Sequence, residues 1–328
     1  MAKLRLGVIG AGSWAVASHL PNFAKRRDEV EFVGVARKGS ELLEKIKNDW
    51  GFRVASEDYR DVIDAGMDIC LVASPHGLHY EHAKAALEAG AHVLCEKPFT
   101  VKPEHAWELV RLAGAKDRHL LVSYGWNYLP WTREAKRLMD EHGIGEIEES
   151  AIHMASVTRE LLANLGAYPD AAPEAIPEQA TWTDPRNGGG YGQAQLTHAL
   201  GAALWLTGLR GEAAFALMKA VLGAPVEHHD AVVIRYDNGS IGTMSGGSCH
   251  LGAGGNRHQT FTNAQSRQRE QSKHLTQSFR FRRRTNSSDA ATCPRGRNRR
   301  RSRWEPNQAP SCRSRPRSSA GSPASPQD

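Results

Sequence analysis

A glutamate and a lysine stand side by side at Glu96-Lys97, directly before Pro98. The apolar run 92–95 before them is typical of a short buried strand, and Pro98 lacks the N–H group that would extend it. In open α/β sheets, ligands bind at the carboxyl ends of the strands. A lysine held there can pair with an anionic group or exchange a proton with an alcohol oxygen. We therefore predict that Lys97 is catalytic, although such a triplet alone also occurs in solvated turns.

A glycine-rich turn follows the first predicted strand, residues 4–9, and reads Gly10-Ala-Gly12-Ser-Trp-Ala15. In this G-x-G-x-x-G/A pattern, Gly10 permits a tight turn, Gly12 leaves room for a pyrophosphate, and Ala15 allows close helix–strand packing. The helix that follows offers backbone N–H groups to the phosphates. We therefore predict a dinucleotide site, and the contacting residues of this turn are Gly10, Gly12, Ser13 and Trp14.

The second predicted strand, residues 30–36, ends at Arg37-Lys38, where the adenosine ribose is expected. NAD sites usually place Asp or Glu near this position to bind the ribose hydroxyls. Two cations instead suit the 2′-phosphate of NADP, and an arginine can also stack on adenine. We therefore predict that Arg37 and Lys38 contact the cofactor and that NADP is preferred to NAD. The alternative is that both are solvated loop charges.

Further strands, residues 68–73, 92–95 and 119–124, alternate with helical patterns. This alternation predicts an α/β fold with a doubly wound parallel Rossmann sheet over residues 1–125. Three residues follow the strand 68–73 and are expected to touch the cofactor: Ser74, Pro75 and His76. The spacing of the next helix places His79 and His82 on its surface.

Residues 126–259 are predicted to form a second, α+β domain for substrate binding and oligomerisation. A helix is expected at 130–142, a long strand at 144–157 and an irregular loop at 160–187. Gly188-Gly-Gly190 introduces another helix, and strands 231–236 and 240–245 are joined by Asp237-Asn-Gly239, a hairpin signal. The pattern predicts a mixed or antiparallel sheet.

Five separated motifs together resemble the Gfo/Idh/MocA family of glucose–fructose oxidoreductase and inositol dehydrogenase, over residues 4–258. They are Gly10-Ala-Gly12, Ser74-Pro75 with His79, Glu96-Lys97-Pro98, Gly-Trp-Asn127, and Gly188-Gly-Gly190 with His198. The resemblance implies an NAD(P)-dependent dehydrogenase or reductase that acts on CH–OH groups of a sugar, a polyol or a related carbonyl compound.

Carried over by position, the resemblance also assigns roles to single residues. Lys97 relays the proton of the substrate hydroxyl, and His198 works with it as acid and base. Glu96 orients the nicotinamide region, Asn127 lies near it, and His79 joins the cofactor site. Many members place Asp four residues before the histidine, where this chain has Ala194. Catalysis then rests on Lys97 and His198 alone, or the protein is a non-catalytic nucleotide-binding sensor or scaffold.

The 328-residue chain carries a formal net charge of +6, but the charge is unevenly distributed. Residues 260–328 contain 16 Lys and Arg against 4 Asp and Glu, a net charge of +12, so residues 1–259 carry −6. The same stretch has no Val, no Ile and a single Leu, Leu275. Such a composition buries too little apolar surface to fold, so we predict a disordered basic tail from residue 260.

Two explanations for this tail are open. An evolved basic segment, residues 267–317, would bind nucleic acid or another polyanion. Alternatively, a shift of reading frame explains why the composition changes within the predicted second domain and not at a linker. The sheet would then lack its last strands and expose an unpaired edge. We favour the frameshift, which makes a family-like homo-oligomer doubtful and adds an inactive truncated product to the alternatives.

The sequence argues against several other classes of protein. No run of eighteen apolar residues is present, and a predicted strand begins at Leu4 without signal-peptide architecture. The five cysteines show no C-x-x-C spacing, and Cys70 and Cys95 lie in predicted buried strands. We therefore predict a cytoplasmic protein with a small-molecule substrate, no membrane partner and no metal ion.

Overall fold

The computed structural model describes residues 2–166, 180–248 and, for the backbone alone, 275–283. The first sheet has six parallel strands in the order β3-β2-β1-β4-β5-β6. They are β1 (Leu4–Ile9), β2 (Val30–Ala36), β3 (Val54–Ser56), β4 (Ile69–Val72), β5 (His92–Cys95) and β6 (Leu120–Val122). The strand order reverses between β1 and β4, and this is the switch point at which doubly wound sheets bind their ligands.

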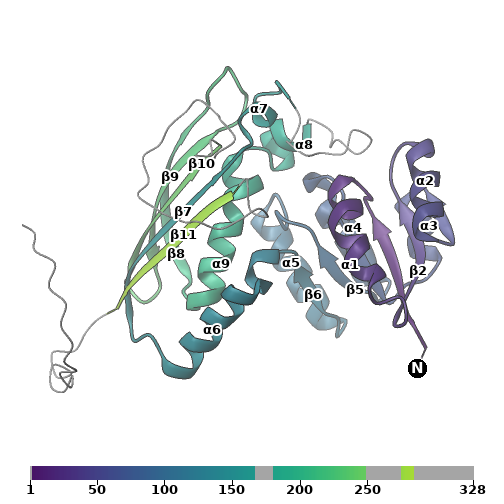
Figure 1. Cartoon of the computed structure of the whole chain (residues 1–328), viewed down its shortest axis with the longest axis horizontal. Coiled ribbons are helices and arrows are strands. Elements are labelled where there is room, and N and C mark those ends of the chain that lie inside the picture. Colours follow the sequence, from purple (N-terminus) through teal and green to yellow (C-terminus); the bar gives the residue numbers. More distant parts are fainter. Residues whose placement is uncertain (1, 167–179, 249–274, 284–328) are drawn as a thin grey trace, which may run out of the picture. The chain divides into compact units, whose positions relative to one another are not determined.

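Helices cover both faces of this sheet (Figure 1). The π-helical turn η1 (Ala15–His19), α1 (Leu20–Ala24) and α2 (Ser40–Trp50) pack on one face through Leu20, Leu43 and Ile46. On the other face lie α3 (Tyr59–Asp64), α4 (His79–Glu88) and α5 (Pro103–Ala115). Because the strands are apolar on both sides, the sheet is buried from both, as parallel sheets require. The predicted Rossmann sheet is confirmed.

The second sheet is mixed, with the strand order β11-β7-β10-β9-β8. Its strands are β7 (Ile147–Ser156), β8 (Gly211–Lys219), β9 (His229–Tyr236), β10 (Ile241–Gly247) and β11 (Leu275–Arg283). Only β7 and β10 run parallel among these pairs. One face packs against α9 (Thr197–Thr207), as Figure 1 shows, and Ala199 and Ala203 of that helix enter the core. The predicted mixed sheet and helix are therefore confirmed.

Several elements differ from the sequence-based predictions. Strand β8 was not predicted, because its alanines, leucine and methionine are good helix formers and only pairing with β9 extends them. The predicted irregular loop contains short helical turns, α7 (Arg159–Leu162), α8 (Ala180–Thr183) and η5 (Pro185–Asn187). The helix expected at 130–142, by contrast, is confirmed as α6 (Pro130–His142), which follows the short turn η3 (Gly125–Tyr128).

The predicted disordered tail is wrong for residues 275–283. Their backbone forms β11, which pairs antiparallel with β7, so the edge of β7 is covered. The sequence there alternates Phe279 and Phe281 with arginines, which suits a strand, but averaging over the whole stretch concealed this short pattern. The rest of the predicted tail, residues 260–274 and 284–328, lies outside the described residues. The nucleic-acid hypothesis for 267–317 therefore stays a prediction.

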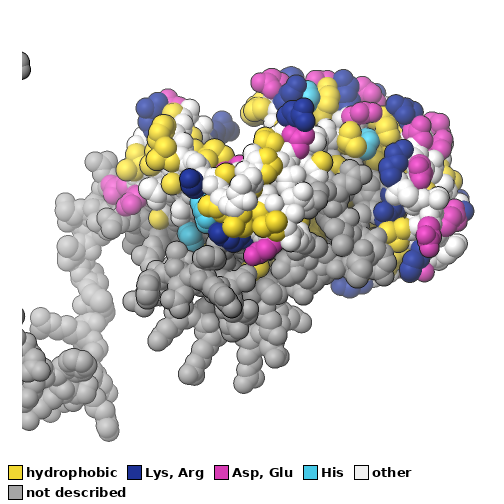
Figure 2. Space-filling model, turned by 90° about the horizontal axis from the view of Figure 1, so that it is seen from above, with side chains coloured by type: hydrophobic (Ala, Val, Ile, Leu, Met, Phe, Trp, Pro, Cys, Tyr) yellow, Lys and Arg dark blue, Asp and Glu magenta, His cyan; other side chains and the backbone are white. Residues whose placement is uncertain are grey.

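The described surface carries charges of both signs. Figure 2 shows acidic and basic side chains interleaved over the right-hand part of the described surface, with more hydrophobic side chains toward the left. In the described part of the chain, no helix is long and apolar enough to cross a membrane.

His79 and His82 are 0% and 8% exposed, so their predicted place on a helix surface is wrong. The His79 ring lies between the carbonyls of Pro98 and Ser74, and the His82 ring packs on Tyr59 of α3.

Asp230 on β9 carries the one strongly raised carboxyl pKa among the described residues. The residue is buried, and its Oδ2 atom has no hydrogen-bond partner within the described ranges. Burial raises the pKa of this carboxyl to about 7, and the nearby charge of Glu227 adds to the effect. Below about pH 7, the neutral acid is therefore the main form of Asp230 in the folded protein.

We predict that Asp230→Asn stabilises the protein at pH 8. A carboxyl whose folded pKa lies above its ordinary value favours folding at low pH, and that stability is lost between about pH 4 and pH 7. The amide stays neutral throughout, so the variant should match the wild type at pH 4 and melt several degrees higher at pH 8. Thermal unfolding of both proteins across this range measures the difference. A constant difference at every pH would contradict the assignment.

Candidate active site

The glycine turn lies between the carboxyl ends of β1 and β4. Gly10 has φ +88°, and a Cβ there would lie 2.2 Å from the Ser74 backbone nitrogen, so the turn requires glycine. At Gly12, by contrast, a Cβ would meet nothing within 4 Å. A side chain at this position would therefore fill open space at the start of the helical run 13–24. The open space and the helix start together fit a dinucleotide phosphate.

The other predicted cofactor contacts near the glycine turn differ in how far their side chains are exposed. Trp14 is 58% exposed, and Ser13 is half-buried beside it. The Arg37 side chain folds back, with Nε donating to the Lys38 carbonyl at 2.9 Å and Nη1 to the Ala11 carbonyl at 3.3 Å. Burial lowers the pKa of the Arg37 guanidinium, which nevertheless remains a cation. Lys38 is exposed.

Glu96 follows β5 and is held by three groups. His19 Nε2, at the end of η1, lies 2.6 Å from Glu96 Oε1, and the Lys97 N–H donates to Oε2 at 3.1 Å. Burial alone would raise the pKa of the Glu96 carboxyl, but the His19 contact and the Lys97 charge lower it to about 2. A hydrogen bond from Ser123 acts in the same direction. Glu96 is therefore an anion at neutral pH.

Lys97 is turned toward the second half of the chain. Its Nζ donates to the Ala194 carbonyl at 2.8 Å, within the π-helical turn η6 (Gly192–Leu196) that precedes α9. Nζ also lies 5.8 Å from the centroid of the Trp182 ring. Burial lowers the pKa of the Lys97 ammonium, and the charge of Glu96 offsets part of that change. π-Helical turns are frequent at functional sites.

His198 is close enough to Lys97 and Glu96 to feel both charges. Its ring is stacked on Trp126 at a centroid distance of 5.1 Å, and Tyr124 meets it edge-on at 6.1 Å. Burial and the Lys97 charge lower the pKa of His198 to about 3, so the imidazole is neutral. Its Nδ1 is buried and has no hydrogen-bond partner among the described residues, which is rare for a buried polar atom.

The predicted residues after β4 divide into two groups. His79 is structural, because its ring nitrogens lie 2.8 Å from the carbonyls of Pro98 and Ser74. The Ser74 hydroxyl is similarly engaged, 2.9 Å from His82 Nδ1. His76 faces Trp182 edge-on, and burial, with the Lys97 charge, lowers the pKa of its ring to about 3. His76 therefore belongs to the surroundings of Lys97.

Pro75 and Asn127 complete the predicted set. Pro75 is exposed at the start of the short turn η2 (His76–Leu78). Asn127 is buried in η3, and its Oδ1 has no partner within the described ranges, as expected of a group that awaits a ligand. Together with the open space at Gly12, this orphaned acceptor indicates that the residues present fit a nicotinamide dinucleotide.

Three site residues escaped the sequence analysis: His19, Trp126 and Trp182. His19 has no motif of its own, and only the turn of η1 brings its ring to Glu96. Trp126 belongs to the motif Gly-Trp-Asn127 but has no role that the motif predicts, and Trp182 lies in the stretch predicted to be an irregular loop. An aromatic residue shortly before the three glycines was the one available signal. In the described part of the chain, His, Cys, Asp and Glu side chains form no group that could hold a metal ion.

The fold and the glycine turn define a dinucleotide-binding protein of the Rossmann type. Residues 4–124 match the family model described as an oxidoreductase family with an NAD-binding Rossmann fold, and residues 132–262 match the GFO/IDH/MocA C-terminal domain. The chain therefore belongs to the Gfo/Idh/MocA oxidoreductase family, as its motifs indicated.

Individual relatives agree with this family. D-glucoside 3-dehydrogenase of Escherichia coli (strain K12) is 31% identical over 147 residues, 44% of this chain and 42% of that protein. D-xylose 1-dehydrogenase (NADP(+)) of Hypocrea jecorina is 34% identical over 122 residues, 36% of this chain and 31% of that protein. The chain thus spans less than half the length of these curated relatives.

A solved structure shows the same fold. The WlbA dehydrogenase of Bordetella pertussis, in complex with NADH and UDP-GlcNAcA, superimposes with a TM-score of 0.65 at 20% identity. The match covers 76% of this chain and 72% of that chain.

We predict opposite outcomes for alanine at the two glycines of the turn. Gly12→Ala should leave the melting temperature within about 2 °C, because its Cβ meets no protein atom, but weaken NADPH and NADH binding at least tenfold. Gly10→Ala should destabilise the fold itself, because its Cβ would overlap the Ser74 backbone. Thermal unfolding and cofactor fluorescence titration measure both effects. Unchanged binding in a folded Gly12→Ala protein would refute the dinucleotide site.

Proposed function

We propose that this protein is an NAD(P)-dependent dehydrogenase or reductase that acts on a CH–OH group of a sugar, a polyol or a related carbonyl compound. The observation that carries the proposal is the position of Lys97, a desolvated amine at the carboxyl end of β5 in a Rossmann sheet. Its neighbour Glu96 contacts His19 in the helical run that follows the glycine turn. A lysine with a lowered pKa is suited to exchange a proton with an alcohol oxygen near neutral pH.

The chemistry of the site divides between the protein and its cofactor. A bound nicotinamide supplies the acceptor or donor of the hydride that the substrate carbon loses or gains. Oxidation of the alcohol also releases the hydroxyl proton, which the neutral Lys97 amine accepts. In the reverse direction, the Lys97 ammonium donates that proton to the carbonyl oxygen. The Ala194 carbonyl holds Nζ in place without adding charge, so it does not raise the pKa as a carboxylate would.

His198 is proposed as the second catalytic residue. Its neutral ring and unpartnered Nδ1 support a hydrogen bond to a substrate hydroxyl. The fixed stacking on Trp126 holds the ring in one orientation. With His76 and Trp182, these aromatic groups surround a few polar atoms, which is typical of small-molecule sites. The relatives named for D-glucoside and D-xylose support a sugar-like substrate.

NADP is the proposed preferred cofactor, with NAD as the second choice. The cations of Arg37 and Lys38 at the end of β2 support a contact with a 2′-phosphate. One of the two relatives is named as NADP-dependent. A cytoplasmic location also stays a prediction, and the free, buried thiols of Cys70 and Cys95 support a reducing compartment.

A homo-oligomer is supported by the second sheet. Strands β8, β9 and β10 expose large apolar side chains on the face away from α9: Phe215, Leu217, Val233 and Ile241. Contiguous exposed apolar side chains mark interaction surfaces. The paired edge of β7 removes one reason for doubting such an assembly.

A non-catalytic sensor or scaffold is the second candidate. Ala194 favours it, because this position offers no carboxylate to assist His198. The hydrogen bond from Lys97 to the Ala194 carbonyl favours the enzyme instead, because it keeps the amine in place without that carboxylate. Turnover on substrates separates the two candidates.

We predict that Lys97→Ala lowers turnover by about 10²–10⁴-fold and leaves NADPH binding within about threefold, because the proton acceptor is lost and the phosphate site is not. The wild type is first assayed with NADP⁺ and NAD⁺ on D-glucose, D-xylose, myo-inositol and a methyl glucoside. Lys97→Arg is the matched control, since arginine keeps the charge but cannot accept a proton at these pH values. Full turnover in either variant would exclude Lys97 as the proton carrier. A wild type that binds NADPH but turns over no substrate would favour the sensor.

A further inference from the structure

A carboxylate lies near the end of β2, although none follows that strand directly in the sequence. It belongs to Glu57, which follows β3. The Gly39 N–H donates to Glu57 Oε1 at 2.9 Å. Gly39 lies two residues beyond Arg37 and forms the N-cap of α2, with φ +90°. Glu57 follows β3, which is the parallel neighbour of β2 at the edge of the sheet. Parallel pairing of β2 with β3 brings this carboxylate to Gly39 from 18 residues further along the chain, so the residues that directly follow β2 give no sign of it.

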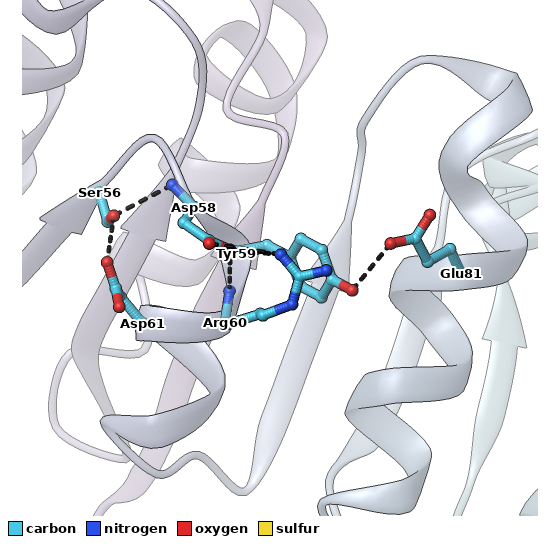
Figure 3. Close-up of polar contacts among 6 residues, drawn as sticks. All are labelled: Ser56, Asp58, Tyr59, Arg60, Asp61 and Glu81. Carbon is cyan, nitrogen blue, oxygen red and sulfur yellow. Dashed lines mark hydrogen bonds and ion pairs between the residues drawn. The ribbon is translucent and has the colours of Figure 1, made fainter.

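The position of Glu57 is fixed by its neighbours on both sides. The Ser56 carbonyl accepts from the Arg37 N–H at 3.2 Å, which ties the end of β3 to the end of β2. Figure 3 shows how the next residues are held: the Asp58 N–H donates to the Ser56 hydroxyl, and that hydroxyl donates to Asp61. Asp58 in turn caps α3 by accepting from the Arg60 N–H at 2.9 Å. The Glu57 carboxylate is therefore presented by a rigid loop.

The Gly39 N–H, which donates to Glu57, is also a suitable donor for a phosphate. The backbone N–H groups at the start of the eleven-residue helix α2 attract an anion, and Arg37 and Lys38 stand just before them. In Rossmann sites, the end of the second strand meets the ribose, and a cation there accommodates a 2′-phosphate. An internal carboxylate on the Gly39 N–H occupies one of these donors and repels a second anion.

We propose that Glu57 is a specificity-determining residue that competes with the 2′-phosphate of NADP at the Gly39 N–H. This inference rests on the dinucleotide site of the proposed function and concerns only the choice between its two cofactors. The cations Arg37 and Lys38 favour NADP, and Glu57 opposes them, so the protein binds both cofactors with a small NADP preference. Removing the Glu57 charge therefore increases the preference for NADP over NAD.

The test is a fluorescence titration of NADPH and NADH at fixed ionic strength, with the full chain. Glu57→Gln keeps the size of the side chain and removes its charge, so that a phosphate can displace the weaker amide acceptor from the Gly39 N–H. NADPH should bind about fivefold more tightly in this variant, as for other exposed charge pairs, while NADH affinity should not change. Glu41→Gln is the matched control, because Glu41 lies in the first turn of α2 and carries the same charge.

Calorimetric titration with 5′-AMP and with adenosine 2′,5′-bisphosphate isolates the 2′-phosphate. The gain in Glu57→Gln should appear with the bisphosphate alone. An unchanged NADPH-to-NADH ratio would overturn the proposal, as would weaker NADH binding at constant NADPH affinity, which would make Glu57 a ribose ligand. An equal gain in Glu41→Gln would also overturn it. Failure of the wild type to bind either dinucleotide would instead refute the proposed function.

Discussion

The hydrogen bond from Lys97 Nζ to the Ala194 carbonyl is the contact on which the site depends. It joins the carboxyl end of β5 to the π-helical turn before α9, and so connects the Rossmann sheet with the helix that carries His198. A buried ammonium is costly unless it is paired and hydrogen-bonded. Here the carbonyl, the Trp182 ring and the Glu96 charge share that task.

The ionisable groups around Lys97 share one buried environment, but their pKa values are shifted so that they differ in protonation state. Burial lowers the pKa of Lys97 and of the rings of His76 and His198, while hydrogen bonds and the lysine charge keep Glu96 ionised. The site therefore contains one fixed anion, two neutral imidazoles and one amine that can change its charge. Such separation of neighbouring pKa values is how enzymes assign acid and base roles.

The local features of this site could be predicted from the sequence, and the long-range ones could not. Gly10 and Lys97 were recognised because a tight turn and a strand end leave a signature within a few residues. The Ala194 carbonyl left none, since a backbone acceptor is the same for every residue type. Glu57 was missed because parallel pairing, not sequence distance, brings β3 to β2. Strand β8 was missed because pairing with β9 overrides its helical propensity.

The most direct test of this account is an NMR titration of the Lys97 side chain in the full-length protein with isotope-labelled lysine, assigned with Lys97→Arg. A desolvated amine held by a neutral carbonyl should titrate below a lysine in a model peptide, whose pKa is about 10.4. Such a value would establish Lys97 as an amine able to carry a proton between substrate and solvent. A pKa equal to or above that of the exposed lysines would contradict the central claim.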